Sequence, residues 1–321
     1  MKAVFLDYAT VGPGLDTSPL SDLLPELNLF DATSDEQVVD RTRDAEFVFA
    51  NKTRLGDAVF AEAHKLRFIG LTATGTDNID LEGAKRRGIA VCNIRGYCTR
   101  SVTEHVFGLL LSLTHNLPRY SAAVREGAWQ QAPDFCMLAY PLRELSTMTM
   151  GIVGYGELGS AVARKAREFD MDVLISARPG TDPVAASTND DRVSFDALLS
   201  RSDVISLHCP LTDETRELFA ADTFRKMKST AILINTARGA LIDSAALAGA
   251  LQSGEISAAA IDVLPQEPPT HGDPLLDYRG GNLLITPHVA WGTDRSRQDS
   301  IHELAANVRA FLAGEKRNRV V

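Results

Sequence analysis

The sequence predicts an α/β protein built from two doubly wound parallel-sheet domains. Short apolar runs alternate with helix-like stretches over the first hundred residues, and the alternation restarts at Met148. A glycine-rich turn, Gly154-Tyr155-Gly156-Glu157-Leu158-Gly159, stands between an apolar strand and a helix in the second half of the chain. The length of 321 residues also favours two domains.

The first half of the chain contains the elements of one such domain. The expected strands are residues 3–6, 47–50, 68–71 and 90–93, and the expected helices include 35–43, 57–63 and 81–87. Strands that alternate with helices predict a parallel sheet with helices on both faces. A single long apolar helix, residues 101–117, follows, and Pro118 then opens a polar stretch with aromatic residues that runs to about residue 146.

The second half supplies enough strands for one complete dinucleotide-binding domain. They are residues 151–153, 172–176, 204–207, 231–235, 258–261 and 283–285. The last helix, residues 294–312, has apolar side chains at helical spacing but no new strand beside it. We expect it to pack on the first domain, which is then discontinuous. The predicted division is a substrate domain of residues 1–98 and 289–321 around a cofactor domain of residues 99–288.

The glycine-rich turn is the strongest single motif. Glycines in a tight turn let the backbone approach a pyrophosphate closely, and the following helix offers N–H groups and the positive end of its dipole. The plain alternative is an ordinary strand–turn–helix connection with permissive glycines. The position of the motif, directly after a strand and directly before a helix, favours a bound dinucleotide.

Composition and charge restrict the partners and the compartment. The net charge of −9 argues against DNA or RNA, which need a basic surface. The longest apolar stretches fall short of the roughly 18 residues of a membrane span, and the first residues, Met1 to Asp7, are typical of a strand and not of a signal peptide. The four cysteines form no Cys-x-x-Cys pair. We therefore expect a cytoplasmic protein with reduced thiols, no metal site and no membrane partner.

Three polar side chains follow the ends of three expected strands. They are Arg238, Glu267 and His288. The carboxyl ends of strands in an open α/β sheet face the ligand crevice. Taken singly, each has a plain alternative: an arginine in a surface ion pair, a solvated glutamate and a structural histidine. Taken together, within one dinucleotide-binding domain, they suit the reduction of a 2-oxo acid.

That reduction needs three functions from the protein. Hydride transfer leaves negative charge on the carbonyl oxygen, which a general acid such as His288 must protonate. A neighbouring carboxylate favours the imidazolium, so Glu267 paired with His288 would keep the acid protonated near neutral pH. Arg238 presents paired donors that would hold the substrate carboxylate and polarise the ketone.

Taken in order, the motifs of the chain resemble the D-2-hydroxyacid dehydrogenase family, and the resemblance covers essentially the whole chain. The segments that carry it are Gly75-Thr76-Asp77-Asn78-Ile79-Asp80, residues 154–159, Leu207-His208-Cys209-Pro210-Leu211-Thr212 with Glu214-Thr215, residues 235–239, Asp262 with Glu267-Pro268, and Pro287-His288. Asn93-Ile94-Arg95-Gly96-Tyr97 and His288-Val289-Ala290-Trp291 are similar to the glycerate dehydrogenase and hydroxypyruvate reductase branch. The implied fold is a Rossmann cofactor domain inserted in a flavodoxin-like substrate domain.

The resemblance implies a role for each matching residue. Arg238 matches the catalytic arginine that binds the substrate, Glu267 the acid that tunes the histidine, and His288 the proton donor and acceptor. The residues that match the cofactor site are Thr103, Gly154, Tyr155, Gly156, Glu157, Leu158, Gly159, Arg178, His208, Pro210, Thr215, Thr236, Ala237 and Asp262. Of these, Asp262 is expected to contact the nicotinamide carboxamide.

The first domain is expected to hold the other end of the substrate. The backbone of Thr74 and Gly75 matches the cradle for the substrate carboxylate, and Lys52 stands in a loop that commonly adds a contact. The family is usually dimeric. Residues 119–146 correspond to the arm that often contributes to that interface, so a homodimer is expected.

One position departs from the pattern of NAD-specific sites. An acid at the end of the second strand would bind the ribose 2′-hydroxyl, but Ala177 stands there and Arg178 follows. Asp172 cannot substitute, because it lies at the other end of the strand, about 16 Å away for five residues. Without the acid, a 2′-phosphate is not repelled, and Arg178 can pair with it. The sequence thus predicts use of NAD(P), leaning towards NADP(H); the alternative is that Arg178 only stacks on adenine.

The expected function is an oxidoreductase that interconverts a small 2-oxo acid, such as hydroxypyruvate or glyoxylate, and its D-2-hydroxy acid. Phosphite oxidation uses the same three residues and stays open. Phosphoglycerate is less favoured, because no regulatory domain follows residue 321. Formate is disfavoured, because that branch lacks the glutamate. A dinucleotide-sensing corepressor is the alternative from a different class.

Overall fold

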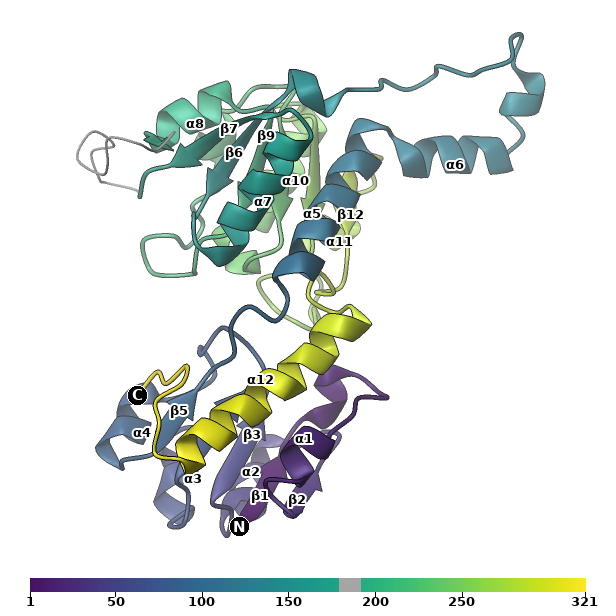
Figure 1. Ribbon diagram of the computed structural model, residues 1–321. Coiled ribbons are helices and arrows are strands. Elements are labelled where there is room, and N and C mark those ends of the chain that lie inside the picture. The colour runs from purple at the N-terminus through teal and green to yellow at the C-terminus, as the bar shows by residue number, and fades with distance from the viewer. Residues whose placement is uncertain (179–191) are drawn as a thin grey trace. The chain divides into compact units, whose positions relative to one another are not determined.

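The computed structural model describes residues 1–178 and 192–321. The chain divides into two compact units (Figure 1). The first unit is Met1–Cys98 together with Trp291–Val321, and the second unit is Thr99–Ala290. Among the described residues, no helix is both long and apolar enough to cross a membrane.

The first unit is built on a five-stranded parallel sheet of order β2-β1-β3-β4-β5. The strands are β1 (Lys2–Phe5), β2 (Glu26–Leu29), β3 (Phe47–Ala50), β4 (Phe68–Leu71) and β5 (Ala90–Cys92). Four of them agree with the predicted strands to within a residue or two. The sequence did not predict β2, because this edge strand reads Glu-Leu-Asn-Leu and has no continuous apolar run.

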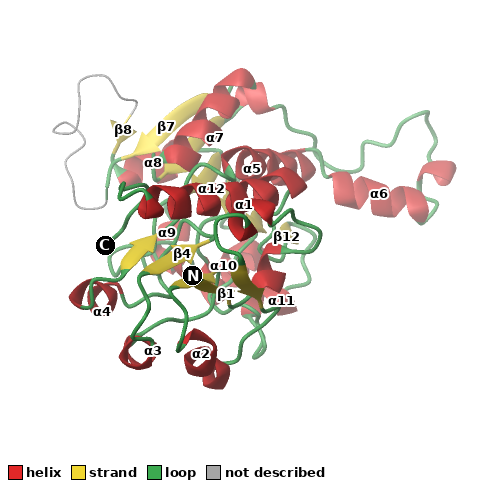
Figure 2. Cartoon of the chain, turned by 60° about the horizontal axis from the view of Figure 1, so that its bottom comes forward, coloured by secondary structure: helices red, strands yellow, loops and turns green. Residues whose placement is uncertain are grey.

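Helices cover both faces of that sheet (Figure 2). On one face lie α2 (Asp35–Thr42), α3 (Asp57–Glu62) and α4 (Leu81–Arg86), and on the other lie α1 (Ser18–Ser21) and α12 (Asp294–Leu312). The apolar stripe of α12 packs against the buried phenylalanines of three strands. Leu304 of α12 lies so close to Gly70 that a Cβ added at Gly70 would be 2.5 Å from Cδ1 of Leu304. The final helix therefore completes the core of the first unit.

The second unit is built on a seven-stranded parallel sheet of order β12-β11-β10-β9-β6-β7-β8. The strands are β6 (Thr149–Val153), β7 (Asp172–Ser176), β8 (Arg192–Val193), β9 (Val204–Leu207), β10 (Ile232–Asn235), β11 (Ala258–Ile261) and β12 (Leu283–Ile285). The order reverses at β6, which is the point where open α/β sheets bind ligands. Only β8 was not predicted, since a strand of two residues shows no periodicity.

The helices of the second unit are α5 (Thr99–Thr114), α6 (Leu117–Arg125), α7 (Glu157–Glu168), α8 (Phe195–Arg201), α9 (Ala221–Phe224), α10 (Ser244–Ser253) and α11 (Pro274–Asp277). Short 3-10 turns are Trp129–Gln131, Leu145–Thr147 and Gly239–Leu241 here, and Tyr8–Val11 in the first unit. Figure 1 shows α5 and α7 side by side on the sheet.

The predicted end of the long helix at residue 117 is wrong. α5 ends at Thr114, Asn116 adopts the left-handed region with φ 50°, and α6 begins at Leu117. Pro118 fits in the first turn of the new helix, where a missing N–H costs nothing. The segment from α6 to residue 146 projects from the body of the second unit (Figure 1).

Candidate active site

His288 and Glu267 form a direct hydrogen-bonded pair at the carboxyl edge of the second sheet. The Nδ1 atom of His288 lies 2.6 Å from Oε2 of Glu267, and Oε1 accepts a 2.8 Å hydrogen bond from the backbone N–H of Leu264. The histidine side chain is 27 % exposed and the glutamate side chain 32 %, so both are accessible from solvent. Because a carboxylate only accepts, Nδ1 carries a hydrogen, and proton exchange with a substrate is left to Nε2.

The backbone that carries His288 is held by Asp262. His288 has a left-handed φ of 56°, an uncommon conformation for a residue with a side chain. Its N–H donates to the carbonyl of Asp262 at 2.7 Å, and the Asp262 carboxylate accepts the N–H groups of Val289 and Ala290 at 2.9 Å each. Asp262 is 1 % exposed, and these bonds compensate the burial of its charge. The predicted cofactor residue Asp262 thus also shapes the loop.

Arg238 stands on the adjoining loop, after β10. The buried Asn235 folds this loop: its Nδ2 donates to the carbonyl of Arg238 at 2.8 Å, and its Oδ1 accepts the N–H of Ala237 at 3.0 Å. The arginine itself donates from Nη1 to the Ala237 carbonyl at 2.8 Å. At Gly239 a Cβ would lie 2.0 Å from the carbonyl carbon of Leu264, so glycine lets this loop lie against the start of the Glu267 loop. Asn235 and Gly239 belong to the sequence motif, but the sequence alone did not predict the hydrogen bonds of Asn235 or the close packing at Gly239.

The glycine turn fits a pyrophosphate. Gly154 has a φ of +96°, and a Cβ there would lie 2.4 Å from the backbone nitrogen of Cys209. A Cβ at Gly159 would lie 2.0 Å from the carbonyl oxygen of Gly154. Within residues 1–178 and 192–321, a Cβ at Gly156 would meet nothing within 4 Å, and no side chain caps the N-terminus of α7. Two glycines are thus required by close packing, and the third opens space directly in front of the helix, as a bound phosphate requires.

Two other predicted cofactor residues carry buried polar atoms that lack a hydrogen-bond partner among the described residues. These are Nδ1 of His208, after β9, and Oγ1 of Thr236, after β10. Burial lowers the pKa of His208 to about 4, so the ring is neutral, and its Nε2 lies 2.9 Å from Oγ of Ser206. Buried polar atoms normally have partners, so these two fit a ligand that supplies them.

Two other predicted cofactor residues, Thr215 and Thr103, use their hydroxyl groups in bonds within the second unit. The Thr215 hydroxyl donates to the carbonyl of Pro210 at 2.8 Å and accepts the N–H of Thr212 at 2.7 Å, so it shapes the loop after β9. The Thr103 hydroxyl donates to the carbonyl of Thr99 within α5 at 2.7 Å. Tyr155, Glu157 and Leu158 lie in the glycine turn and the first turn of α7.

An alanine follows the end of β7 at the position of the usual acid, and two arginines stand after β7 and on the neighbouring strand β8. Ala177 is 4 % exposed, and Arg178 follows it. On β8, Arg192 pairs with Ile175, and its guanidinium carbon lies 5.8 Å from the centre of the Tyr155 ring in the glycine turn. Arg192 was not among the predicted cofactor residues, because β8 itself was not predicted.

The predicted substrate residues Lys52, Thr74 and Gly75 belong to the first unit. Asp7, at the end of β1, holds the loop of Lys52: its carboxylate accepts the N–H groups of Asn51, Lys52 and Thr53 at 2.9, 2.7 and 2.7 Å. The Thr74 hydroxyl donates to the carbonyl of Ile94 at 3.0 Å. The sequence showed only that Asp7 follows the first strand, and it did not predict that Asp7 holds the loop of residues 51–53.

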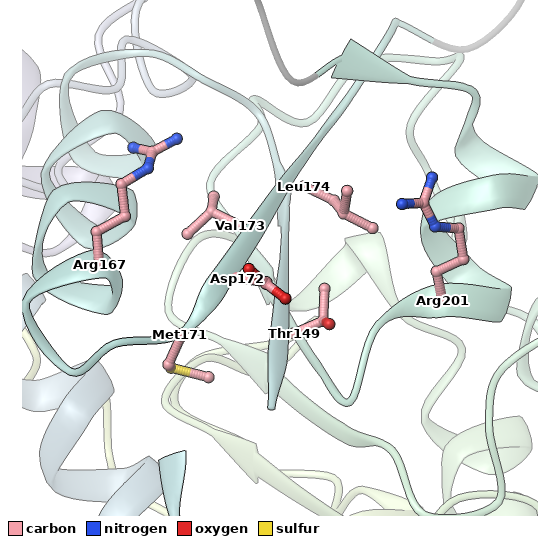
Figure 3. A pocket seen from close by; sticks show the side chains of 7 residues that line it. All are labelled: Thr149, Arg167, Met171, Asp172, Val173, Leu174 and Arg201. Atoms are coloured by element: carbon pink, nitrogen blue, oxygen red, sulfur yellow. The ribbon is translucent and has the colours of Figure 1, made fainter. Parts of the chain in front are cut away.

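A hollow of about 500 Å³ lies at the opposite edge of the second sheet (Figure 3). It is lined where β6 and β7 begin, and Arg167 and Arg201 lie on either side of Asp172. Ligands of open α/β sheets bind at the carboxyl ends of strands, so this hollow is separate from the candidate site.

Comparison with known proteins identifies the family. Residues 107–290, more than half of the chain, match the model of the D-isomer specific 2-hydroxyacid dehydrogenase NAD-binding domain. The chain is 39 % identical over 321 residues to a glycerate dehydrogenase of Methylorubrum extorquens, covering 99 % of this chain and 98 % of that protein. It is 39 % identical over 324 residues to a hydroxypyruvate reductase of Blautia hydrogenotrophica, covering 100 % and 99 %.

A solved structure agrees with these relatives. The D-lactate dehydrogenase of Aquifex aeolicus, complexed with NAD and lactic acid, is similar with a TM-score of 0.82 and 30 % identity, over 98 % of this chain and 96 % of that one. The fold, with two parallel-sheet α/β units, is the fold of these enzymes. The chain therefore belongs to the D-isomer specific 2-hydroxyacid dehydrogenases, which are NAD-dependent oxidoreductases.

Proposed function

We propose that this protein reduces a small 2-oxo acid, hydroxypyruvate or glyoxylate, to the D-2-hydroxy acid with NADPH or NADH, and catalyses the reverse reaction. The observation that carries the proposal is the 2.6 Å pair of His288 and Glu267, in the same unit as the glycine turn. Glu267 stands on the loop after β11, next to the loop of Arg238 after β10. The names of the relatives from Methylorubrum extorquens and Blautia hydrogenotrophica support this substrate class.

The roles follow from the chemistry of the side chains. A nicotinamide dinucleotide, when bound at the glycine turn, supplies the hydride. Arg238 holds the substrate carboxylate through its paired donors and polarises the ketone. His288 delivers a proton from Nε2 to the carbonyl oxygen as negative charge develops there, and Glu267 stabilises the imidazolium through Nδ1. In the first unit, the backbone of Thr74 and Gly75 with Lys52 binds the other side of the substrate.

A panel of 2-oxo acids tested with both reduced cofactors examines this function. Loss of reduced-nicotinamide absorbance with hydroxypyruvate or glyoxylate, at a specificity constant above that for pyruvate or phosphohydroxypyruvate, is the expected result. Binding of NADH without turnover of any 2-oxo acid would instead favour a dinucleotide-sensing, corepressor-like protein. Turnover of phosphite alone with the oxidised cofactor would point to the other chemistry that the same three residues allow.

We infer that NADPH serves at least as well as NADH. The buried Ala177 leaves no acid to repel a 2′-phosphate. Arg178, after the end of β7, and Arg192, on the neighbouring strand β8, provide positive charge. Specificity constants for the two cofactors at fixed hydroxypyruvate test this inference. Arg178→Ala should lower the specificity constant for NADPH much more than that for NADH. Arg201→Ala, at the opposite edge of the same sheet, should change neither constant. A wild-type preference of tenfold for NADH, or equal weakening of both cofactors by Arg178→Ala, would contradict the inference and favour stacking on adenine.

We further propose that the chain forms a homodimer through the projecting segment 117–146. This segment carries exposed apolar side chains, among them Phe135 at 91 % and Leu138 at 76 % exposure. Apolar groups gathered on a projecting segment mark an interaction surface, and a second copy of the chain is the partner that the family implies. Light scattering should give a dimer for the wild type and monomers for Phe135→Asp/Leu138→Asp. The matched Leu276→Asp variant should stay dimeric, and a wild-type monomer would refute the proposal.

We assign the protein to the cytoplasm. All four cysteines are free thiols, and Cys92 and Cys98 are buried. Burial raises the pKa of the Cys92 thiol to about 11, which keeps it protonated and unreactive. Free thiols of this kind fit a reducing compartment. Fractionation of the native host, followed by thiol labelling, tests the assignment.

A further inference from the structure

We propose that Ser101 and His105 of helix α5 are positioning residues that fix the loop of the catalytic histidine, residues 286–290. This inference rests on the proposed function of His288. Neither residue stands near it in the sequence. The alternative is that both make ordinary packing contacts, which would leave the rate of the reaction unchanged when they are removed.

The first anchor is Ser101. Its hydroxyl donates a 2.6 Å hydrogen bond to the carbonyl of Ala290, although 189 residues separate the two. Both residues are buried, with 4 % and 3 % exposure. Water therefore cannot replace this bond easily if it is lost, and the end of the loop is tied to the first turns of α5.

The second anchor is His105, four residues later and so on the same face of α5. Its Nε2 lies 3.0 Å from Oγ1 of Thr286, and the Thr286 hydroxyl is in turn hydrogen-bonded to Oδ1 of the Asp262 carboxylate. A carboxylate can only accept, so the single hydroxyl proton points to Asp262. The threonine oxygen then accepts, and His105 must donate from Nε2–H.

The two anchors meet at Asp262, which holds the segment after His288. Its carboxylate accepts the N–H groups of Val289 and Ala290 at 2.9 Å each, in addition to the Thr286 hydroxyl. His288 therefore lies between two anchored points, Thr286 before it and Ala290 after it. A left-handed backbone at a histidine is maintained only where the surroundings impose it, and α5 supplies that support.

The test compares variants that remove the donors with variants that keep them. Ser101→Ala, His105→Leu and their combination remove the anchors, and His105→Gln restores an amide N–H at the second one. Ser112→Ala, in the last turn of α5, and His115→Leu, directly after α5, make the same changes away from the bonds to the loop. Hydrogen exchange of peptide 286–291, kcat and KM for hydroxypyruvate, and the Kd for NADH are measured for each.

In the double variant we expect exchange of peptide 286–291 to accelerate at least about tenfold. We also expect kcat to fall by between about tenfold and a hundredfold, as for a catalytic group displaced by about 1 Å, with the Kd for NADH within about twofold of wild type. His105→Gln should recover most of the loss caused by His105→Leu, and the controls should match wild type.

Unchanged exchange in the double variant would overturn the proposal, and so would faster exchange with an unchanged kcat. An equal loss of kcat in His105→Gln and His105→Leu would also overturn the proposal, because a packing role does not depend on a hydrogen-bond donor. If the wild type reduces no 2-oxo acid, the proposed function fails, and the exchange rates alone then decide whether these residues hold the loop.

Discussion

Glu267 and His288 are 21 residues apart in the chain, yet Oε2 of the first lies 2.6 Å from Nδ1 of the second. The topology explains the approach. Glu267 follows β11 and His288 follows β12, and the two strands are parallel neighbours, with Ile261 opposite Ile285. Their carboxyl ends therefore open at the same edge of the sheet. A carboxylate and an imidazole therefore meet at that edge, as the proposed general acid and its counter-ion require.

Replacing the histidine tests its role as the general acid. His288→Ala should lower kcat for 2-oxo acid reduction by roughly two to four orders of magnitude, because a positioned acid contributes about that much. Binding of NADH should be retained, since the glycine turn is untouched. His271→Ala, an exposed histidine in the same unit, should turn over like the wild type. Steady-state kinetics decide this prediction, and turnover of His288→Ala near the wild-type rate would refute it.

Replacing the counter-ion tests the pair. Glu267→Gln keeps the size of the side chain but no longer offers a negative charge to Nδ1. Without that charge opposite Nδ1, the pH profile of the reductive kcat/KM should move to lower pH. The shift is read from kcat/KM against pH for both proteins. Glu255→Gln, on the loop before β11, is the control and should leave the pH profile unchanged. An unchanged profile in Glu267→Gln would show that Glu267 has only a structural role.

Much of the fold was predictable because the apolar runs are short, strong and bounded by turn residues. Ten of the described strands could be placed to within two residues, and the two that were missed have physical causes. β2 has polar residues at alternate positions of an exposed edge, and β8 has only two residues. Pro118 suggested the end of a helix, but proline also fits the first turn of a new one.

In the candidate site, the positions of polar residues that follow strand ends were predictable. The contacts between segments far apart in the sequence were not. Arg238, Glu267 and His288 each follow the carboxyl end of a strand, so parallel topology alone predicts that they share an edge. The supporting bonds have no such rule. Nothing in the sequence links Ser101 with Ala290 or Asp7 with residues 51–53, because these contacts depend on how helices and loops pack in three dimensions.

The open space at Gly156 gives a test of the cofactor cradle. Its φ of −88° suits any residue, and a Cβ there meets no atom of the described chain within 4 Å, so Gly156→Val should fold normally. The new side chain would occupy the space before the N-terminus of α7, and the Kd for NADH should rise at least about tenfold through the loss of phosphate contacts.

Gly56 offers a matched control for that variant. It also precedes a helix, α3, in an extended conformation with open space at its Cβ position. Gly56→Val should therefore bind NADH with the wild-type Kd. Calorimetric titration of NADH into both variants makes the comparison, and wild-type affinity in Gly156→Val would show that the dinucleotide does not lie at this turn.

Acid should destabilise the protein in part through His208. Burial lowers the pKa of this histidine from 6.5 to about 4. As the pH falls below 6.5 the unfolded chain takes up a proton there, while the folded chain stays neutral until about pH 4. The contribution to stability is thus complete above pH 6.5 and is lost progressively towards pH 4, up to about 3 kcal/mol.

Denaturant unfolding of the wild type and of His208→Gln, across this range, measures the loss. The variant should lose less stability on acidification, while His271→Gln should follow the wild type, and parallel losses in all three proteins would contradict a neutral, buried His208.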